Sequence, residues 1–194
     1  MRALLAFATL SHHHDMATIL PVFYRDDILP EYRDTPVALL LEYHNLGHAL
    51  GSAAAPQLLI GMCMDSRKSL RIPHDFAFIL RTAGANMRDN EFRISYAIAV
   101  GGIRTIVLIA HTDCGMARLD QRHEQFVDGM VSNAGWEREH AERHFAESKP
   151  KFGISDEVGF VLREAERLRG IYPKISVVPL LYRVEDDLLY QIKP

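Results

Sequence analysis

Two cysteines and one histidine have the residue types and spacing of a metal site. The chain contains only two cysteines, Cys63 and Cys114, and each follows an apolar, strand-like run; His111 lies three residues before the second. Two thiolates and one imidazole can hold a zinc ion whose fourth coordination position stays open for chemistry, whereas structural zinc sites are usually closed by a fourth cysteine or histidine. We therefore predict one catalytic zinc ion per chain at Cys63, His111 and Cys114, and no disulfide.

Two polar residues follow the first cysteine at alternating positions. Asp65 lies two residues after Cys63, and Arg67 lies two residues further on, so in an extended segment all three side chains point to the same side. An isolated Asp-Ser-Arg sequence would indicate a helix N-cap with a surface ion pair. Beside a metal ligand, the same residues are placed to act on a molecule at the metal, so Asp65 and Arg67 are catalytic candidates.

Taken together, the motifs resemble those of a known enzyme family. Cys-x-Asp-Ser-Arg at 63–67, Arg-Thr-Ala-Gly at 81–84 and His-x-x-Cys-Gly at 111–115 have the order, spacing and strand context of the beta-class carbonic anhydrases. The similarity runs from position 56 to position 114, with a weaker echo in the last strands. Family members usually have Asn in place of Thr82 and a small residue in place of Met64. These two departures bear on the substrate more than on zinc.

The resemblance implies a zinc-dependent, reversible hydration of carbon dioxide to bicarbonate. In this family a zinc-bound hydroxide attacks carbon dioxide. By resemblance, Arg67 fixes Asp65, and Asp65 accepts a hydrogen bond from the hydroxide. In some family members this aspartate can instead bind zinc and close the site. The family also uses N-terminal helices to grip a partner subunit, which implies a homodimer or a higher homo-oligomer.

Other residues near the motifs receive supporting roles. Ser66 and Arg81 are expected to make backbone and partner contacts, Gly84 to permit a tight turn, and Asp113 to face solvent. A proton must leave the zinc-bound water in each cycle, and histidine is the natural carrier near neutral pH. His74 lies close to the first motif and is our candidate for this carrier.

Three other functions fit parts of the pattern. The same fold and zinc site could hydrolyse carbonyl sulfide or carbon disulfide, because the nucleophile is the same and selection depends on access to the pocket. A catalytically silent zinc-binding homologue would have no need of Asp65 and Arg67. A redox dithiol is disfavoured, since Cys63 and Cys114 do not form a Cys-x-x-Cys arrangement. Carbon dioxide hydration is therefore the main prediction.

The apolar runs predict an α/β fold with a mostly parallel sheet. Four strands and one edge strand are expected, at 57–62, 76–80, 103–110, 174–182 and, for the edge strand, 188–192. Helices between the strands indicate right-handed crossovers and parallel pairing. Ligands of such open sheets bind beyond the carboxyl ends of the strands, which is where both halves of the metal set fall.

The remaining segments are predicted to be helical. Helical spacing, caps and terminal glycines indicate helices at 37–50, 90–100 and 154–169. The polar stretch 116–147 is interpreted as two surface helices that break near Asp128-Gly129 or Asn133. There, His140 and His144 have the i, i+4 spacing of metal ligands, but without a third ligand they are interpreted as a solvated face.

Length and composition indicate a single domain over residues 1–194, with an N-terminal arm and helix at 1–55 and an α/β core at 56–194. The 194 residues are 48% hydrophobic, enough for a sizeable core. A net charge of −3 with interspersed signs predicts neither nucleic-acid nor membrane binding. The apolar run at 1–10 lacks a cleavage site for a signal peptide, and two reduced cysteines fit the cytoplasm, which is the predicted location.

Overall fold

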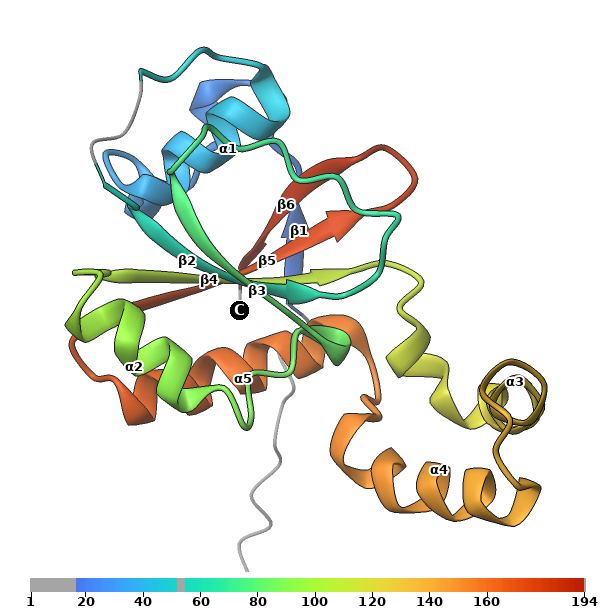
Figure 1. Cartoon of the computed structure of the whole chain (residues 1–194). Helices are drawn as coiled ribbons and strands as arrows, with labels where there is room; N and C mark the ends of the chain where they lie inside the picture. The colour runs from blue at the N-terminus through green and yellow to red at the C-terminus, as the bar shows by residue number, and fades with distance from the viewer. Residues whose placement is uncertain (1–16, 52–54, 194) are drawn as a thin grey trace, which may run out of the picture.

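Six strands form one sheet in this computed structural model, which describes residues 17–51 and 55–193. The apolar run at 1–10 lies outside the described residues. The sheet order is β1-β6-β5-β4-β2-β3 (Figure 1). The strands are Thr18–Leu20 (β1), Leu58–Cys63 (β2), Ala77–Thr82 (β3), Thr105–His111 (β4), Ser176–Arg183 (β5) and Leu188–Lys193 (β6). Strands β2 to β5 pair in parallel and β6 is antiparallel to its neighbours, so the predicted mostly parallel α/β sheet is confirmed.

Helices cover both faces of this sheet. They are Pro36–Leu46 (α1), Glu91–Ala99 (α2), His123–Ala134 (α3), Arg138–Phe152 (α4) and Glu157–Ile171 (α5). In Figure 1, α1 lies on one face, α2 and α5 lie on the other, and α3 and α4 form a hairpin beside the sheet. No helix in the described part of the chain is both long and apolar enough to cross a bilayer.

The central strand β4 contributes to two hydrophobic layers. Val107 and Ile109 belong to the cluster that includes α1, whereas Ile106 and Leu108 belong to the cluster that includes α2 and α5. Successive side chains of a strand point to opposite faces, so an unbroken apolar run is what a strand covered on both sides requires. This burial holds the carboxyl end of β4 firmly in place.

The prediction that the strand at 188–192 is an edge strand was wrong. Strand β1 pairs with β6, with Ile19 opposite Ile192, and completes the sheet on that side. The buried side chain of Gln191 strengthens this junction: its Nε2 donates to the Asp27 carbonyl (3.0 Å) and its Oε1 accepts from the Leu29 backbone N–H (2.8 Å). A three-residue strand is too short to show a hydrophobic period, so the sequence did not predict β1.

The second predicted strand occupies an edge of the sheet. The sequence predicted only the strand at 188–192 as an edge strand, but β3 is an edge strand too: none of its residues is fully buried, and Ile79 is 42% exposed. Strand β2 covers only one side of β3, and no other strand in the described chain pairs with its outer side. The apolar composition of this strand therefore did not distinguish an edge position from a central one.

The two predicted surface helices are present, but they separate at Gly135. This residue adopts φ +70°, a left-handed conformation that suits a glycine at a helix C-terminus, whereas Asp128 and Gly129 lie inside α3. On α4, His140 stacks on Trp136 with ring centroids 4.3 Å apart, and His144 meets the same indole edge-on. The structure thus gives these two histidines an aromatic partner.

Candidate metal centre

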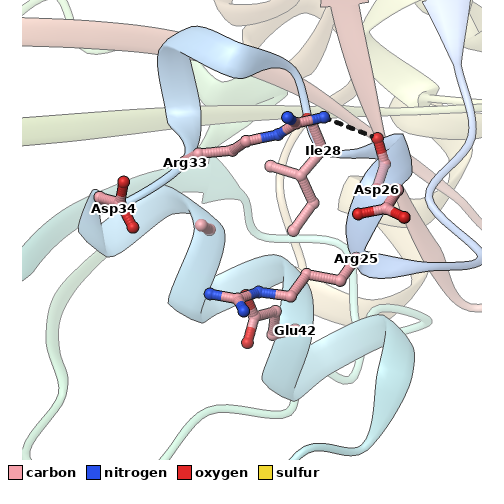
Figure 2. A pocket seen from close by; sticks show the side chains of 7 residues that line it. Arg25, Asp26, Ile28, Arg33, Asp34 and Glu42 are labelled. Carbon is pink, nitrogen blue, oxygen red and sulfur yellow. Dashed lines mark hydrogen bonds and ion pairs between the residues drawn. The ribbon is translucent and has the colours of Figure 1, made fainter.

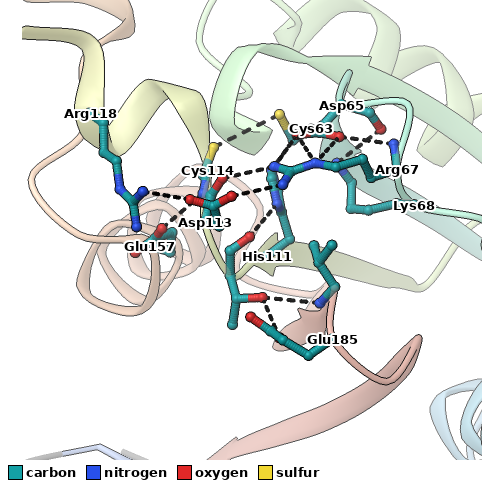
Figure 3. A network of polar contacts seen from close by, with 12 residues as sticks. Cys63, Asp65, Arg67, Lys68, His111, Asp113, Cys114, Arg118, Glu157 and Glu185 are labelled. Carbon is teal, nitrogen blue, oxygen red and sulfur yellow. Dashed lines mark hydrogen bonds and ion pairs between the residues drawn. The ribbon is translucent and has the colours of Figure 1, made fainter. Parts of the chain in front are cut away.

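The sheet topology brings the two halves of the predicted metal set together. Strands β2 and β4 are parallel neighbours, so Cys63 and His111, their last residues, lie at the same edge of the sheet (Figure 3). Cys114 follows β4 after a short turn in which Asp113 has φ +56°. This left-handed residue reverses the chain and brings Cys114 back towards Cys63. Three ligands from two strand ends therefore converge without any residue of the flanking helices.

The three ligand atoms have the arrangement that a tetrahedral zinc ion requires. The two sulfurs are 4.0 Å apart and unbonded, and both sulfurs and a histidine nitrogen lie within 4.8 Å of one another. Two thiolates at the usual Zn–S length of about 2.3 Å in a tetrahedron would be roughly 3.8 Å apart. Each ligand residue is less than 5% exposed. The residues therefore fit a bound zinc ion.

One of the two ring nitrogens of His111 is free to bind a metal. His111 Nδ1 lies 2.9 Å from the Thr112 carbonyl, which fixes the neutral ring as an Nδ1–H donor. Its Nε2 is buried and has no hydrogen-bond partner. An unpaired buried acceptor normally costs stability, but this cost disappears if the lone pair binds a metal. The unpaired Nε2 is thus an independent indication of a ligand.

The thiols favour a shared negative charge. A hydrogen bond from Cys114 lowers the pKa of Cys63 against the effect of burial. The same bond, together with burial, raises the pKa of Cys114. The pair alone would therefore hold one proton between two sulfurs, and a divalent cation would favour thiolate on both.

Asp65 lies next to these ligands and is held by Arg67. Arg67 Nη2 donates to Asp65 Oδ2 (2.8 Å), and Arg67 Nε and the backbone N–H donate to Oδ1 (3.1 and 2.9 Å). Hydrogen bonding from Arg67 holds the pKa of Asp65 well below its usual range. The free side of Oδ2 is 4.0 Å from His111 Nε2. A charged acceptor thus stands beside the metal ligands.

Asp113 is 43% exposed, as expected, but its side chain also pairs with two arginines. Arg67 Nη1 donates to Asp113 Oδ2 and Arg67 Nη2 to the Asp113 carbonyl, both at 2.8 Å, and Arg118 pairs with Oδ1 (2.7 Å). Hydrogen bonding from Arg67, with the nearby charge of Arg118, lowers the pKa of Asp113. Arg67 is therefore clamped between Asp65 and Asp113 (Figure 3). Only the position of Asp113 between two ligands indicated this role in the sequence.

Backbone support comes from the second motif, as expected. Arg81 Nη1 donates to the Cys63 and Asp65 carbonyls, at 3.5 and 3.4 Å. Gly84 has φ +62°, and a Cβ there would lie 3.3 Å from Met116 Cβ, so the predicted tight turn is present and crowded. These contacts hold the loop that follows β2.

The remaining sequence candidates are less engaged. The side chain of His74 is 97% exposed and contacts neighbouring Asp75, so its proposed proton-carrying role stays a prediction. Met64 is 66% exposed. Thr82, by contrast, pairs across the sheet with Cys63, and its hydroxyl is buried without a partner. In the described chain, Thr82 Oγ1 and His111 Nε2 are the two buried side-chain atoms of this kind.

Comparisons with known proteins agree with this geometry. Residues 58–169 match the family model described as carbonic anhydrase. Two carbon disulfide hydrolases match in sequence: one from Acidianus sp. (strain A1-3), 34% identical over 47% of each chain, and one from Saccharolobus solfataricus, 32% identical over 54% of each chain. The chain thus spans about half the length of these relatives. A carbonic anhydrase from Glaciozyma antarctica shares the fold, with a TM-score of 0.54 and 24% identity over 82% of this chain and 96% of that one.

Proposed function

Because this chain belongs to the beta-carbonic anhydrase family, we propose that it is a zinc enzyme that hydrates carbon dioxide reversibly to bicarbonate. The observation that carries the proposal is the open, buried His111 Nε2 between two thiols, with the Asp65 carboxylate 4.0 Å away. A purely structural zinc site would need no such acceptor. Asp65 and Arg67 are the proposed catalytic residues, and Cys63, His111 and Cys114 the proposed metal ligands.

Each residue has a separate task in this proposal. Zinc, when bound, would make a coordinated water acidic enough to act as hydroxide. Asp65 Oδ2 would accept a hydrogen bond from this water and so orient it towards the substrate. Arg67 keeps Asp65 charged and fixes its orientation. Burial of the three ligands excludes competing water from the centre.

The direct test combines metal analysis and a hydration assay on one sample. We expect about one zinc per chain and carbon dioxide hydration that rises through and above neutral pH. Two thiolates cancel the formal charge of zinc, so its bound water should be less acidified than the pKa of about 7 seen with three histidines. Zinc without activity would indicate the silent homologue. Activity that does not change with pH would contradict the proposed nucleophile.

Carbon disulfide hydrolysis is the second candidate. Two relatives carry that name, and the residues that differ from the usual family pattern, Thr82 and Met64, lie beside Cys63 rather than among the ligands. Side-by-side assays of one zinc-loaded preparation with carbon dioxide, carbonyl sulfide and carbon disulfide separate the candidates. A carbon disulfide rate above the carbon dioxide rate would replace the main proposal, although the zinc site would stand.

A homodimer or higher homo-oligomer is proposed as the working form. Phe92 and Tyr96 on α2 and its C-cap residue Val100 follow one another at i, i+4 spacing and are 82%, 55% and 67% exposed. On the arm, Phe23 and Tyr24 are also exposed. Such apolar surface is typical of an interface. Sedimentation should show a dimer or larger, and a stable, active monomer at micromolar concentration would contradict it. The cytoplasmic location stays a prediction that rests on the two unbridged cysteines.

A further inference from the structure

A hollow of about 460 Å³ lies between the end of α4, the face of α5 and the loop before α2. We call it the α4–α5 hollow. Its wall carries four basic residues and one acidic residue: Arg88, Lys151, Arg163 and Arg167 against Glu164. None of these is a candidate metal ligand or catalytic residue. The volume is that of a site for a small molecule.

Acidic partners account for only one of the four cations. Arg167 Nε and Nη2 donate to the two oxygens of Glu164, both at 2.8 Å, and its Nη1 donates to Glu91 (2.8 Å). Glu164 is 2% exposed and also accepts from the Met87 backbone N–H (3.0 Å). Glu164 is thus saturated by its own partners and cannot neutralise the rest of the wall.

The other three cations lack a counter-charge. Arg163 donates to the Ser155 hydroxyl (3.2 Å), and neither it, Arg88 nor Lys151 forms an ion pair with any described residue. The acid at the start of α5, Asp156, is engaged in capping the helix through the Gly159 backbone N–H. Three charges of one sign around one hollow repel each other, and a bound anion would relieve this repulsion.

A second hollow in the molecule provides a comparison, because acidic groups and backbone carbonyls of the protein itself pair with its basic residues. In Figure 2, Arg25 and Arg33 share a hollow of about 240 Å³ with acidic residues. Arg25 Nε donates to Glu42 Oε1 (2.9 Å), and Arg33 donates to the Ile28 and Asp26 carbonyls, both at 2.9 Å. Its arginines are therefore already occupied. The α4–α5 hollow differs because three of its four cations have no acidic partner among the described residues.

We propose that the α4–α5 hollow binds a small phosphate ester. Two of the three unpaired cations are guanidinium groups, whose forked donors match phosphate oxygens. The wall also contains Ile154 and Phe160, which offer apolar surface to the organic part of an ester. Ile154 packs with Cys63 and Cys114 as well, so the hollow and the metal centre share a wall. The zinc-loaded protein is therefore the form to test.

The test is a titration of the zinc-loaded 194-residue chain with phenyl phosphate and with inorganic phosphate at constant ionic strength. Backbone amide NMR shifts report where each ligand binds. We expect saturable shifts at Arg88 and along 151–163, with phenyl phosphate the tighter ligand. Arg163→Gln should weaken binding at least about tenfold, the usual effect of losing one charge-assisted hydrogen bond. Lys151→Gln provides a second, independent variant.

Arg143→Gln is the matched control, because Arg143 lies on α4 in an exposed ion pair with Glu139 and does not line the hollow. It removes one positive charge and should leave the affinity unchanged. Equal weakening by Arg143→Gln and Arg163→Gln would show unspecific charge attraction and overturn the proposal. Shifts confined to residues around Cys63 and His111 would also overturn it, since the ligand would then be at the metal centre. Equal affinities for the two phosphates would remove the ester from the proposal.

Discussion

Two histidines within 17–51 and 55–193 are almost fully buried, yet their surroundings give them different roles. His44 is 0% exposed, and both ring nitrogens are paired: Nδ1 accepts from the Arg71 backbone N–H and Nε2 lies on the Asp187 carbonyl, both at 3.0 Å. His111 is 1% exposed, and only Nδ1 is paired. The first ring joins three segments of the fold, whereas the second keeps one lone pair free beside two sulfurs.

Burial alone does not distinguish a structural histidine from a ligand. What distinguishes them is the second nitrogen: satisfied by the protein in His44, left open in His111. Burial lowers the pKa of His44 to about 4, with the nearby charge of Arg71 acting in the same direction. His44 is thus a neutral ring at physiological pH whose contribution is to stability. Substitutions near His44 should consequently lower stability, whereas substitutions near His111 should lower zinc content and activity.

Loss of a metal ligand should have the largest effect. Cys114→Ser replaces a thiolate with a hydroxyl that binds zinc poorly, so zinc should fall from about one per chain to near zero at neutral pH. Hydration activity should fall by more than about a thousandfold, which corresponds to roughly 4 kcal/mol. Metal analysis after dialysis gives the result. Full zinc occupancy in this variant would remove Cys114 from the ligand set.

His44→Leu should lower stability and leave zinc in place. It leaves the Arg71 N–H and the Asp187 carbonyl without partners in the interior, at a cost of about 3 kcal/mol in the free energy of unfolding. Denaturant unfolding and metal analysis on the same sample check both parts. The exposed His74→Gln variant is the control and should change stability by less than about 0.5 kcal/mol. Zinc loss in His44→Leu would contradict a purely structural role for His44.

The pH dependence of stability extends this prediction. The pKa of His44 is lowered to about 4 in the folded protein, so between about pH 6.5 and pH 4 the unfolded chain binds a proton that the folded chain does not. This contribution to stability is present above pH 6.5 and is lost as pH falls, by up to about 3 kcal/mol. With zinc removed from both samples by a chelator, His44→Leu should lack this part of the slope. Parallel slopes in the two proteins would contradict it.

Asp65→Asn should slow the reaction while keeping the metal. The amide retains the shape of the side chain but is a weaker acceptor for the nucleophile, so we expect activity to fall by about a hundredfold, or roughly 2.7 kcal/mol. Zinc content should stay at about one per chain. Ser66→Ala, beside it in the sequence, is the control. Undiminished activity in Asp65→Asn would show that the proposed role is wrong even if the zinc site is right.

Asp113→Asn should give the smallest change. Asn tolerates the left-handed backbone at this position, so the fold and zinc should be retained, while Arg67 loses one charged partner. We expect about a tenfold fall in activity, or roughly 1.4 kcal/mol. In the double variant with Asp65→Asn, Arg67 no longer has an aspartate to orient. The loss of activity in the double variant should therefore be smaller than the sum of the two single losses, each expressed as a free energy. Fully additive losses would show that Asp113 does not act through Arg67 and Asp65.

Much of the fold could be predicted because the buried strands carry local signals. The apolar runs that became β2 and β4 are long enough to identify by composition alone. Strand β1 could not be predicted, since its partner β6 lies about 170 positions away along the chain and pairs with only three of its residues. The exposure of Ile79 depends on which strand occupies the edge, and this order is a property of the whole sheet.

In the candidate site, too, features with a local sequence signal could be predicted and features that depend on distant contacts could not. The ligands Cys63, His111 and Cys114, and the pair Asp65 and Arg67, lie in short motifs whose spacing already indicated their chemistry. The clamp on Arg67 could not be predicted, because it joins positions 46 residues apart and depends on one left-handed residue. The pairing of His44 depends on contacts 27 and 143 residues away.

The union of β1 with β6 also bears on how the chain acquires its structure during synthesis. Asn45 donates to the Leu189 carbonyl (2.8 Å), and Gln191 donates to the Asp27 carbonyl. Residues 17–45 therefore cannot form these contacts until the chain near position 190 has been synthesised. At about 5 to 20 residues per second, the ribosome supplies those partners roughly 10 to 30 s later. During that interval the nascent chain can already assemble its central parallel strands and the loops that hold the thiols. The early segment, whose Val22 and Ile28 are buried only in the folded protein, is then the part that a chaperone would meet.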